Sequence, residues 1–162
     1  MNAQSGLSFR EAAFGDLPAL IALFADDSMG GHGDTTDIAA RSAYESAFAA
    51  IANSPNDQLF VGVANGEVVA TAQVTFITSL TGRGSTRMLI EAVQTRADMR
   101  GKGIGARLMG HCLEAARKRN AASVQLTSNS QRLDAHRFYE KLGFEKSHAG
   151  FKLKLKAGPA ST

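Results

Sequence analysis

The sequence predicts a mixed α/β fold in which one sheet carries helices on both faces. β-like runs alternate with helical runs along the chain, and Asn65-Gly66 between two apolar runs is a tight-hairpin signal. A strongly periodic helix also follows the β-like run Arg87–Thr95. With 162 residues, 44% of them hydrophobic, the chain can build one core. We expect a single domain over residues 1–157 and a disordered tail over 158–162.

The first half of the chain is expected to hold two helices and three strands. Asp26–Asp37 is rich in glycine and small polar residues and is therefore expected to be a loop. The predicted elements are a strand Leu7–Glu11, a helix through Leu17, Leu20, Ile21 and Phe24, a helix Ile38–Asn53, and strands Leu59–Ala64 and Val68–Ile77.

The second half is expected to hold two helices among several strands, after a polar loop Ser79–Ser85. Its long helix should bury a stripe of Ile104, Leu108, Cys112 and Ala115 and leave His111 exposed. The predicted elements are a strand Arg87–Thr95, a helix Gly103–Arg119, a strand Ser123–Leu126, a short helix from Ala135 that Gly143 stops before another strand, and an edge strand Phe151–Leu155.

Composition excludes several classes of protein. The single cysteine, Cys112, rules out an intrachain disulfide and a multi-cysteine metal site, and it fits a reducing cytoplasm. No metal site is expected. The net charge of +3 suits an anionic ligand but is too small to indicate nucleic-acid binding. No apolar run is long enough for a membrane span, and the N-terminus lacks the pattern of a signal peptide.

Arg100-Gly101-Lys102-Gly103-Ile104-Gly105 lies between a strand and a helix, where glycines let the backbone approach a ligand. A helix N-terminus also offers unpaired N–H groups to an anion, so this segment predicts a phosphate site. A Walker loop is excluded because Gly103 follows Lys102 where Ser or Thr is required. The dinucleotide pattern is formally met, but no carboxylate follows over Ala121–Gln131. A solvated surface turn remains the alternative.

A second motif follows about 30 residues later, Ala135-His136-Arg137-Phe138-Tyr139-Glu140-Lys141-Leu142-Gly143-Phe144. With it, the chain resembles the GNAT superfamily of acyl-CoA-dependent N-acetyltransferases over about Met88 to Phe144. The family's pyrophosphate pattern is met by Arg100, Gly103 and Gly105. Its later A-x-x-F-Y-x-x-x-G-F signature is met by Ala135, Phe138, Tyr139, Gly143 and Phe144.

The resemblance implies a mostly antiparallel sheet whose fourth and fifth strands splay apart, with acetyl-CoA as co-substrate in the gap. The N–H groups of the glycine-rich segment would hold the pyrophosphate, and strand 4 would run beside the pantetheine arm. An N–H of the Ala92–Gln94 region would then face the thioester carbonyl. The expected cofactor-binding residues are Val93, Thr95, Arg100, Gly101, Lys102, Gly103, Ile104, Gly105, Ala106 and Asn129.

The reaction implied is direct attack of a primary amine on the thioester, through a tetrahedral intermediate. Tyr139 is the candidate acid for the leaving thiolate; packing is its alternative role. Glu91 is the candidate base. Strand alternation predicts that it shares a face with Val93 and Thr95, and an ion pair with Arg87 or Arg96 is its alternative role. Asn129 is as well suited to a turn as to a cofactor contact.

The expected function is therefore N-acetylation of a small-molecule amine. Two alternatives remain: a protein or peptide acetyltransferase acting on lysines or N-termini, and a non-catalytic acyl-CoA-binding regulatory domain. The resemblance assigns acceptor choice to the loops Asp26–Asp37 and Ser79–Ser85, whose residues do not name the acceptor. It also allows a homodimer. No nucleic-acid or membrane partner is expected.

Overall fold

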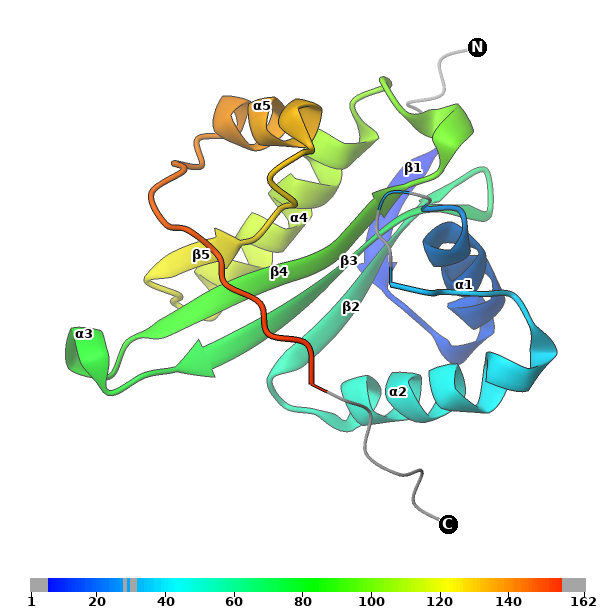
Figure 1. The fold of residues 1–162 in the computed structure, drawn as a ribbon, viewed down its shortest axis with the longest axis horizontal. Coiled ribbons are helices and arrows are strands. Elements are labelled where there is room, and N and C mark those ends of the chain that lie inside the picture. Colours follow the sequence, from blue (N-terminus) through cyan, green and yellow to red (C-terminus); the bar gives the residue numbers. More distant parts are fainter. Residues whose placement is uncertain (1–5, 28, 30–31, 156–162) are drawn as a thin grey trace. The chain divides into compact units, whose positions relative to one another are not determined.

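The computed structural model describes residues 6–27, 29 and 32–155. These form two compact units, of which the first ends at Leu126 and the second begins at Thr127 (Figure 1). The predicted tail 158–162 lies outside the described residues.

The first unit is built on a five-stranded sheet in the order β1-β2-β3-β4-β5 (Figure 1). Neighbouring strands are antiparallel except for β4 and β5, which are parallel, so the predicted mixed and mostly antiparallel sheet is confirmed. The strands are β1 (Leu7–Glu11), β2 (Asp57–Ala64), β3 (Glu67–Thr78), β4 (Thr86–Thr95) and β5 (Ser123–Leu126).

The β2–β3 hairpin turns at Asn65-Gly66, as the sequence predicts. Both residues have positive φ, 52° and 80°, which is the conformation that a two-residue hairpin loop requires. Asparagine and glycine tolerate it better than other residues.

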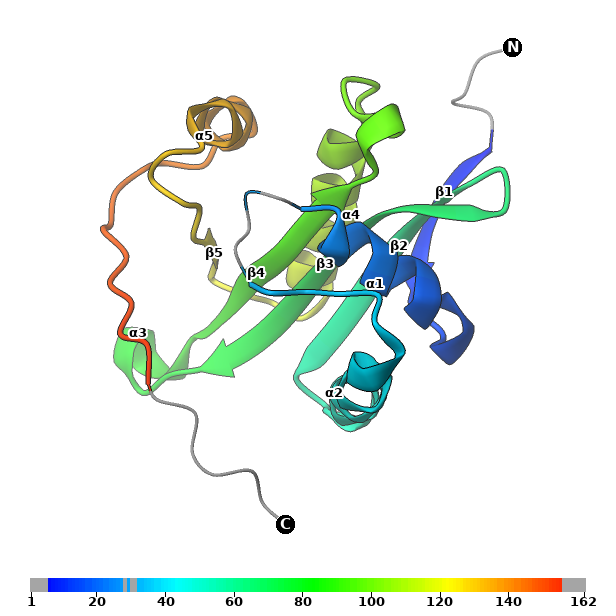
Figure 2. The ribbon, with the colours of Figure 1, turned by 45° about the vertical axis from the view of Figure 1, so that its right-hand side comes forward.

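Helices lie on both faces of this sheet, as predicted (Figure 2). The helices α1 and α2 cover one face, and α4 packs on the other against β2, β3 and β4. The helices of this unit are α1 (Leu17–Ala25), α2 (Arg41–Asn53), the single turn α3 (Thr81–Gly84) and α4 (Ile104–Lys118), with 3-10 turns η1 (Phe14–Asp16), η2 (Ile38–Ala40) and η3 (Ala97–Met99).

The buried stripe of α4 is wider than the sequence predicted, and Ala116 rather than Ala115 is fully buried. The buried residues are Ile104, Leu108, Met109, Cys112 and Ala116. The expectation that His111 is exposed was wrong. Its ring stacks on Phe9 at 5.8 Å between centroids and meets Phe60 edge-on at 4.7 Å. Burial, with a smaller effect from Lys118, lowers the pKa of His111.

The second unit contains α5 (Leu133–Lys141). The helix ends at a glycine cap, as predicted: Gly143 has φ 95°, and the Phe144 N–H donates to the Tyr139 carbonyl at 3.1 Å. The strands expected after Gly143 and over Phe151–Leu155 were wrong, because this segment pairs with none of the described residues and a strand exists only through such pairing. Phe151 is 97% exposed, so the apolar residues that alternate with lysines in this segment do not pack on a core in this structure.

Candidate active site

Strand β4 carries a bulge at the point where the site is expected. Thr71 of β3 pairs with Gln94 and Gln73 pairs with Glu91, so Ala92 and Val93 stand opposite one residue of β3. Ala92 has φ 53°, a left-handed conformation that an alanine rarely adopts. Such a residue is held in place by the surrounding structure, and strain of this kind concentrates at functional sites.

The bulge lies where β4 leaves its parallel neighbour. Pairing with β5 runs from Arg87–Ser123 to Ile90–Leu126 and ends there, one residue before Glu91 and the bulge that follows it. The Arg96 N–H donates to the Val69 carbonyl of β3 at 2.8 Å. Because successive strand residues direct their backbone groups to opposite edges, Thr95 and Val93 direct theirs away from β3. This is the edge along which the sequence predicts the pantetheine arm.

The N-terminus of α4 follows directly. Gly101 and Gly103 have φ 75° and 77°, and a Cβ built on either would meet no atom within 4 Å. The first helical bond is from the Arg107 N–H to the Gly103 carbonyl at 3.2 Å. Among the described residues, no backbone acceptor takes the N–H groups from Gly101 to Ala106. The segment therefore fits a pyrophosphate, which would accept these donors at the positive end of the helix dipole.

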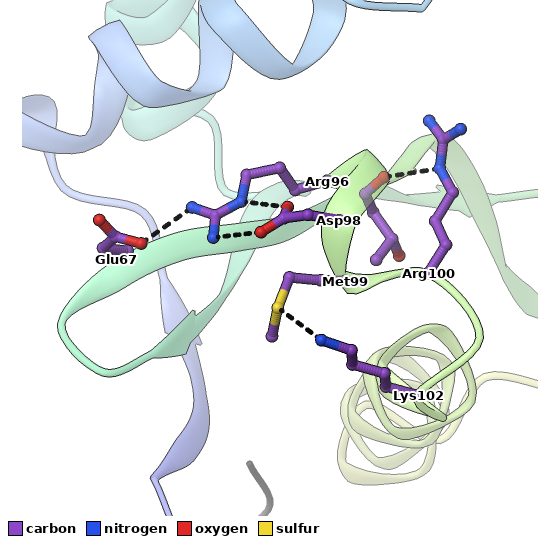
Figure 3. Close-up of polar contacts among 7 residues, drawn as sticks. Glu67, Arg96, Asp98, Met99, Arg100 and Lys102 are labelled. Carbon is purple, nitrogen blue, oxygen red and sulfur yellow. Dashed lines mark hydrogen bonds and ion pairs between the residues drawn. The ribbon is translucent and has the colours of Figure 1, made fainter.

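Two cations border this helix end, and Figure 3 shows both. Arg100 Nε donates to the Thr95 carbonyl at 3.1 Å, which leaves the rest of its guanidinium free of described partners (Figure 3). Lys102 Nζ lies 3.7 Å from the Met99 sulfur, a weak contact that a phosphate oxygen could readily replace.

A third cation, Arg96, is engaged by protein carboxylates instead. Its Nε lies 2.7 Å from Asp98 and its Nη1 lies 3.0 Å from Glu67 (Figure 3). The hydrogen bonds that Arg96 donates to Asp98, and secondly to Glu67, raise the pKa of Arg96. The guanidinium thus connects the β2–β3 hairpin to the turn that precedes α4.

The alternative role of Glu91 finds no support, and the predicted face that it shares with Thr95 was wrong. The side chain is exposed, and it forms no ion pair with Arg87, Arg96 or any other described residue. Nor does it share a face with Thr95: Glu91 lies opposite Gln73 and Thr95 opposite Ala70, and those two β3 residues are on opposite faces. The bulge is the cause, because its extra residue shifts the alternation of side chains along β4.

Tyr139 and Asn129 belong to the second unit. The Tyr139 ring packs against Phe138 and Phe144, with centroids 5.2 Å and 6.0 Å away. Burial raises the pKa of Tyr139, and the charge of Arg132 opposes this more weakly. Its hydroxyl has no hydrogen-bond partner among the described residues, so at neutral pH it keeps a proton that it can donate.

Asn129 serves the turn before α5. Its Oδ1 accepts the Gln131 N–H at 2.9 Å, and its carbonyl accepts the Arg132 N–H at 3.0 Å. The same carbonyl lies 2.9 Å from His136 Nε2. The turn role that the sequence allowed is therefore present, and it leaves the amide nitrogen of Asn129 free for a further contact.

Other chemistries find little support in the part of the chain that the structure describes. It holds no group of three or more His, Cys, Asp or Glu side chains placed to bind a metal. None of its helices combines the length and apolar character needed to cross a bilayer. Cys112 is buried in α4, and burial raises its pKa to about 12, which keeps the thiol protonated.

Two features of this site could not be anticipated from the sequence. Nothing about an alanine indicates positive φ, so the bulge at Ala92 could not be anticipated. The contact between Asp27 and Gln94 joins residues 67 positions apart, and only the folded sheet brings them together.

A bulged strand that runs into a glycine-rich helix start suits a class of protein that binds a phosphate-bearing ligand. Comparison with known proteins identifies the class. The model of the acetyltransferase (GNAT) family matches residues 18–144. The chain therefore belongs to the GNAT family of acetyltransferases and is an acyltransferase.

Individual relatives agree with this assignment. The aminoalkylphosphonate N-acetyltransferase of Salmonella typhimurium is 34% identical over 109 residues, which make up 67% of this chain and 70% of that protein. A structure from Bacillus halodurans, described as a transcriptional regulator, is 40% identical with a TM-score of 0.88. The match covers 92% of this chain and 99% of the Bacillus halodurans chain. A putative acetyltransferase from Agrobacterium tumefaciens is 32% identical with a TM-score of 0.79, covering 91% and 99%.

Proposed function

We propose that this protein transfers the acetyl group of acetyl-CoA to a primary amine of a small molecule. One observation carries the proposal. Two features belong to consecutive segments of the chain: the edge of the bulged strand, where Val93 directs its backbone groups away from β3, and the N–H groups from Gly101 to Ala106, which no described backbone group accepts. The N–H groups at the start of α4 suit a pyrophosphate, and the edge of β4 suits an extended arm that ends in a carbonyl.

Each residue then has a defined task. Acetyl-CoA supplies the acetyl group as a thioester. Arg100 and Lys102 bind the phosphates, and the Val93 N–H donates to the carbonyl oxygen as its negative charge develops. The exposed Glu91 accepts, directly or through water, the proton that the acceptor ammonium loses before its nitrogen attacks the thioester. The Tyr139 hydroxyl donates a proton to the departing sulfur, and the second proton lost by the nitrogen of the tetrahedral intermediate restores the hydroxyl through water.

The acceptor class rests on the named relatives. The Salmonella typhimurium protein acetylates aminoalkylphosphonates by its name, and this chain is similar to it over two thirds of its length. A small primary amine is accordingly the substrate we propose here. Because Cys112 is a free, buried thiol, we propose the reducing cytoplasm as its location.

The test is thiol release from acetyl-CoA in the presence of aminoalkylphosphonates, other small amines, aminoglycosides and lysine peptides. We expect turnover with a small amine and none with the peptides. Tyr139→Phe should lower kcat by roughly 100-fold, the scale of general acid catalysis, and leave the Kd for acetyl-CoA unchanged. Preference for peptides would favour a protein acetyltransferase. An unchanged kcat would remove Tyr139 as the acid.

A regulatory domain that binds acyl-CoA without turnover is the second candidate. It is favoured by the similarity to the Bacillus halodurans structure described as a transcriptional regulator. The same assay separates the two functions. Tight acetyl-CoA binding by calorimetry, with no thiol release across the panel, would support regulation, and turnover with any amine would support the enzyme.

A further inference from the structure

One side-chain contact joins the end of α1 to the bulged part of β4. Asp27 Oδ2 accepts a hydrogen bond from Gln94 Nε2 at 2.5 Å. Both side chains are half-buried, and the other carboxylate oxygen of Asp27 accepts the Met29 N–H at 3.3 Å. A short bond to an ionised acceptor is among the stronger hydrogen bonds in proteins.

Gln94 occupies a sensitive position in β4. It is the residue at which one-to-one pairing with β3 resumes after the bulge, opposite Thr71. Val93, its neighbour, directs its backbone groups away from β3 toward the proposed thioester. Any shift of Gln94 would therefore change the direction of the Val93 N–H.

The segment between α1 and η2 is also bound at its other end. The Tyr44 hydroxyl of α2 donates to Asp34 Oδ1 at 2.8 Å and accepts the Thr35 N–H at 3.1 Å. Asp27 thus fixes one end of this segment to β4, while Tyr44 fixes the other to α2.

We propose that Asp27 is a positioning residue for acetyl transfer. Through Gln94 it holds the bulged part of β4, and with it the Val93 N–H, in a fixed place relative to the α1–η2 segment. This inference rests on the proposed function, because the Val93 N–H is the group that stabilises the oxyanion there. A small displacement of a group of this kind costs a large factor in rate.

A double-mutant cycle tests the proposal. Asp27→Ala and Gln94→Ala should each lower kcat by roughly tenfold with the KM for acetyl-CoA unchanged, and the double variant should be no worse than either one. Asp27→Asn keeps an oxygen that can accept from Gln94 and should recover most of kcat. Losses that multiply in the double variant, or an Asn variant as slow as the Ala variant, would overturn the proposal.

Asp26→Ala is the matched control. It removes the same charge from the adjacent, exposed residue, whose side chain forms no hydrogen bond among the described residues. Because Asp26 lies in the loop to which the resemblance assigns acceptor choice, kcat is compared at saturating amine, where its change should stay below roughly twofold whatever happens to the KM for the amine. A loss equal to that of Asp27→Ala would assign the effect to charge in this segment, against the proposed contact.

Hydrogen exchange provides a second measurement that needs no substrate. Amides in peptides covering Glu91–Thr95 should exchange faster in Asp27→Ala and Gln94→Ala to the same extent, and at the original rate in Asp26→Ala. Thermal midpoints confirm that all variants fold. If the protein acetylates no amine, the proposed function fails, but the exchange rates still show whether Asp27 holds the bulged part of β4 in place. Unchanged exchange in Asp27→Ala and Gln94→Ala would refute that role of Asp27.

Discussion

Arg96 and Asp98 form a two-bond ion pair at the start of the turn that leads into α4. Arg96 Nε and Nη2 donate to the two carboxylate oxygens of Asp98 at 2.7 and 3.0 Å. The fork geometry fixes the orientation of both side chains. The pair therefore helps to hold the backbone between β4 and the glycine-rich segment.

Arg96→Leu should weaken acetyl-CoA binding although Arg96 is already occupied by protein carboxylates. We expect the Kd, measured by calorimetry, to rise by roughly two- to fivefold because the turn before the phosphate site loses its restraint. Arg117→Leu serves as control, because among the described residues this charge on α4 pairs only with Glu114. An equal rise in both variants would indicate a general charge effect.

Gly103→Ala should destabilise the fold through its backbone alone. The positive φ of Gly103 costs an L-residue about 1–2 kcal/mol, and the new Cβ meets no atom within 4 Å. Gly110 has the same open space but lies inside α4, so Gly110→Ala should stabilise by about 0.5–1 kcal/mol. Urea unfolding of both variants measures the difference, and equal effects would contradict the left-handed conformation of Gly103.

Asp16 should contribute to stability in a pH-dependent way. The hydrogen bond from Arg10 chiefly, with help from the Ala13 N–H, holds the pKa of Asp16 below its ordinary value of 3.8. A carboxylate whose pKa is lower in the folded state stabilises the fold at pH values above its pKa in the unfolded state. This contribution is lost as the pH falls through its pKa in the folded state. Asp16→Asn should therefore cost about 1 kcal/mol near neutral pH, and less at pH values below 3.8.

Urea unfolding at several pH values checks this prediction. Asp134→Asn is the control, because Asp134 pairs with Arg137 in an exposed position with 96% of its side chain accessible. It should change stability little at any pH. A cost for Asp16→Asn that stays constant into acid would show that its charge is not responsible.

Cys112 should react with thiol reagents only when the protein opens. It is fully buried, and its pKa of about 12 leaves almost no thiolate near neutral pH. Because it is the only cysteine of the chain, labelling reports on this one position. We expect slow labelling of the native protein that accelerates with denaturant in step with unfolding, whereas fast labelling in buffer would contradict the burial.

Local features of the fold were predictable because their causes lie in adjacent residues. Asn65-Gly66 fixed the hairpin, Gly143 ended α5, and the spacing of Ile104, Leu108 and Cys112 defined the inner face of α4. In each case the backbone conformation or the buried face follows from side chains within two turns of one another.

Features that depend on distant pairing were not predictable. The surroundings of Glu91 depend on the bulge at Ala92, and that bulge arises from how β3 and β4 register over their whole length. His111 is only partly exposed because the rings of Phe9 in β1 and Phe60 in β2 pack against it. Strand alternation in one segment carries no information on either.

The order of the strands has a consequence for how the chain reaches this structure. The strands β2, β3 and β4 are neighbours in sequence and in space, and short connections join them. Pairing β1 with β2 must close a loop that contains α1 and α2, and pairing β5 with β4 must await the crossover through α4. The three central strands should therefore form the folding nucleus. Ala92 would then adopt its left-handed conformation early, and both outer strands would pair with a sheet in which the bulge is already formed.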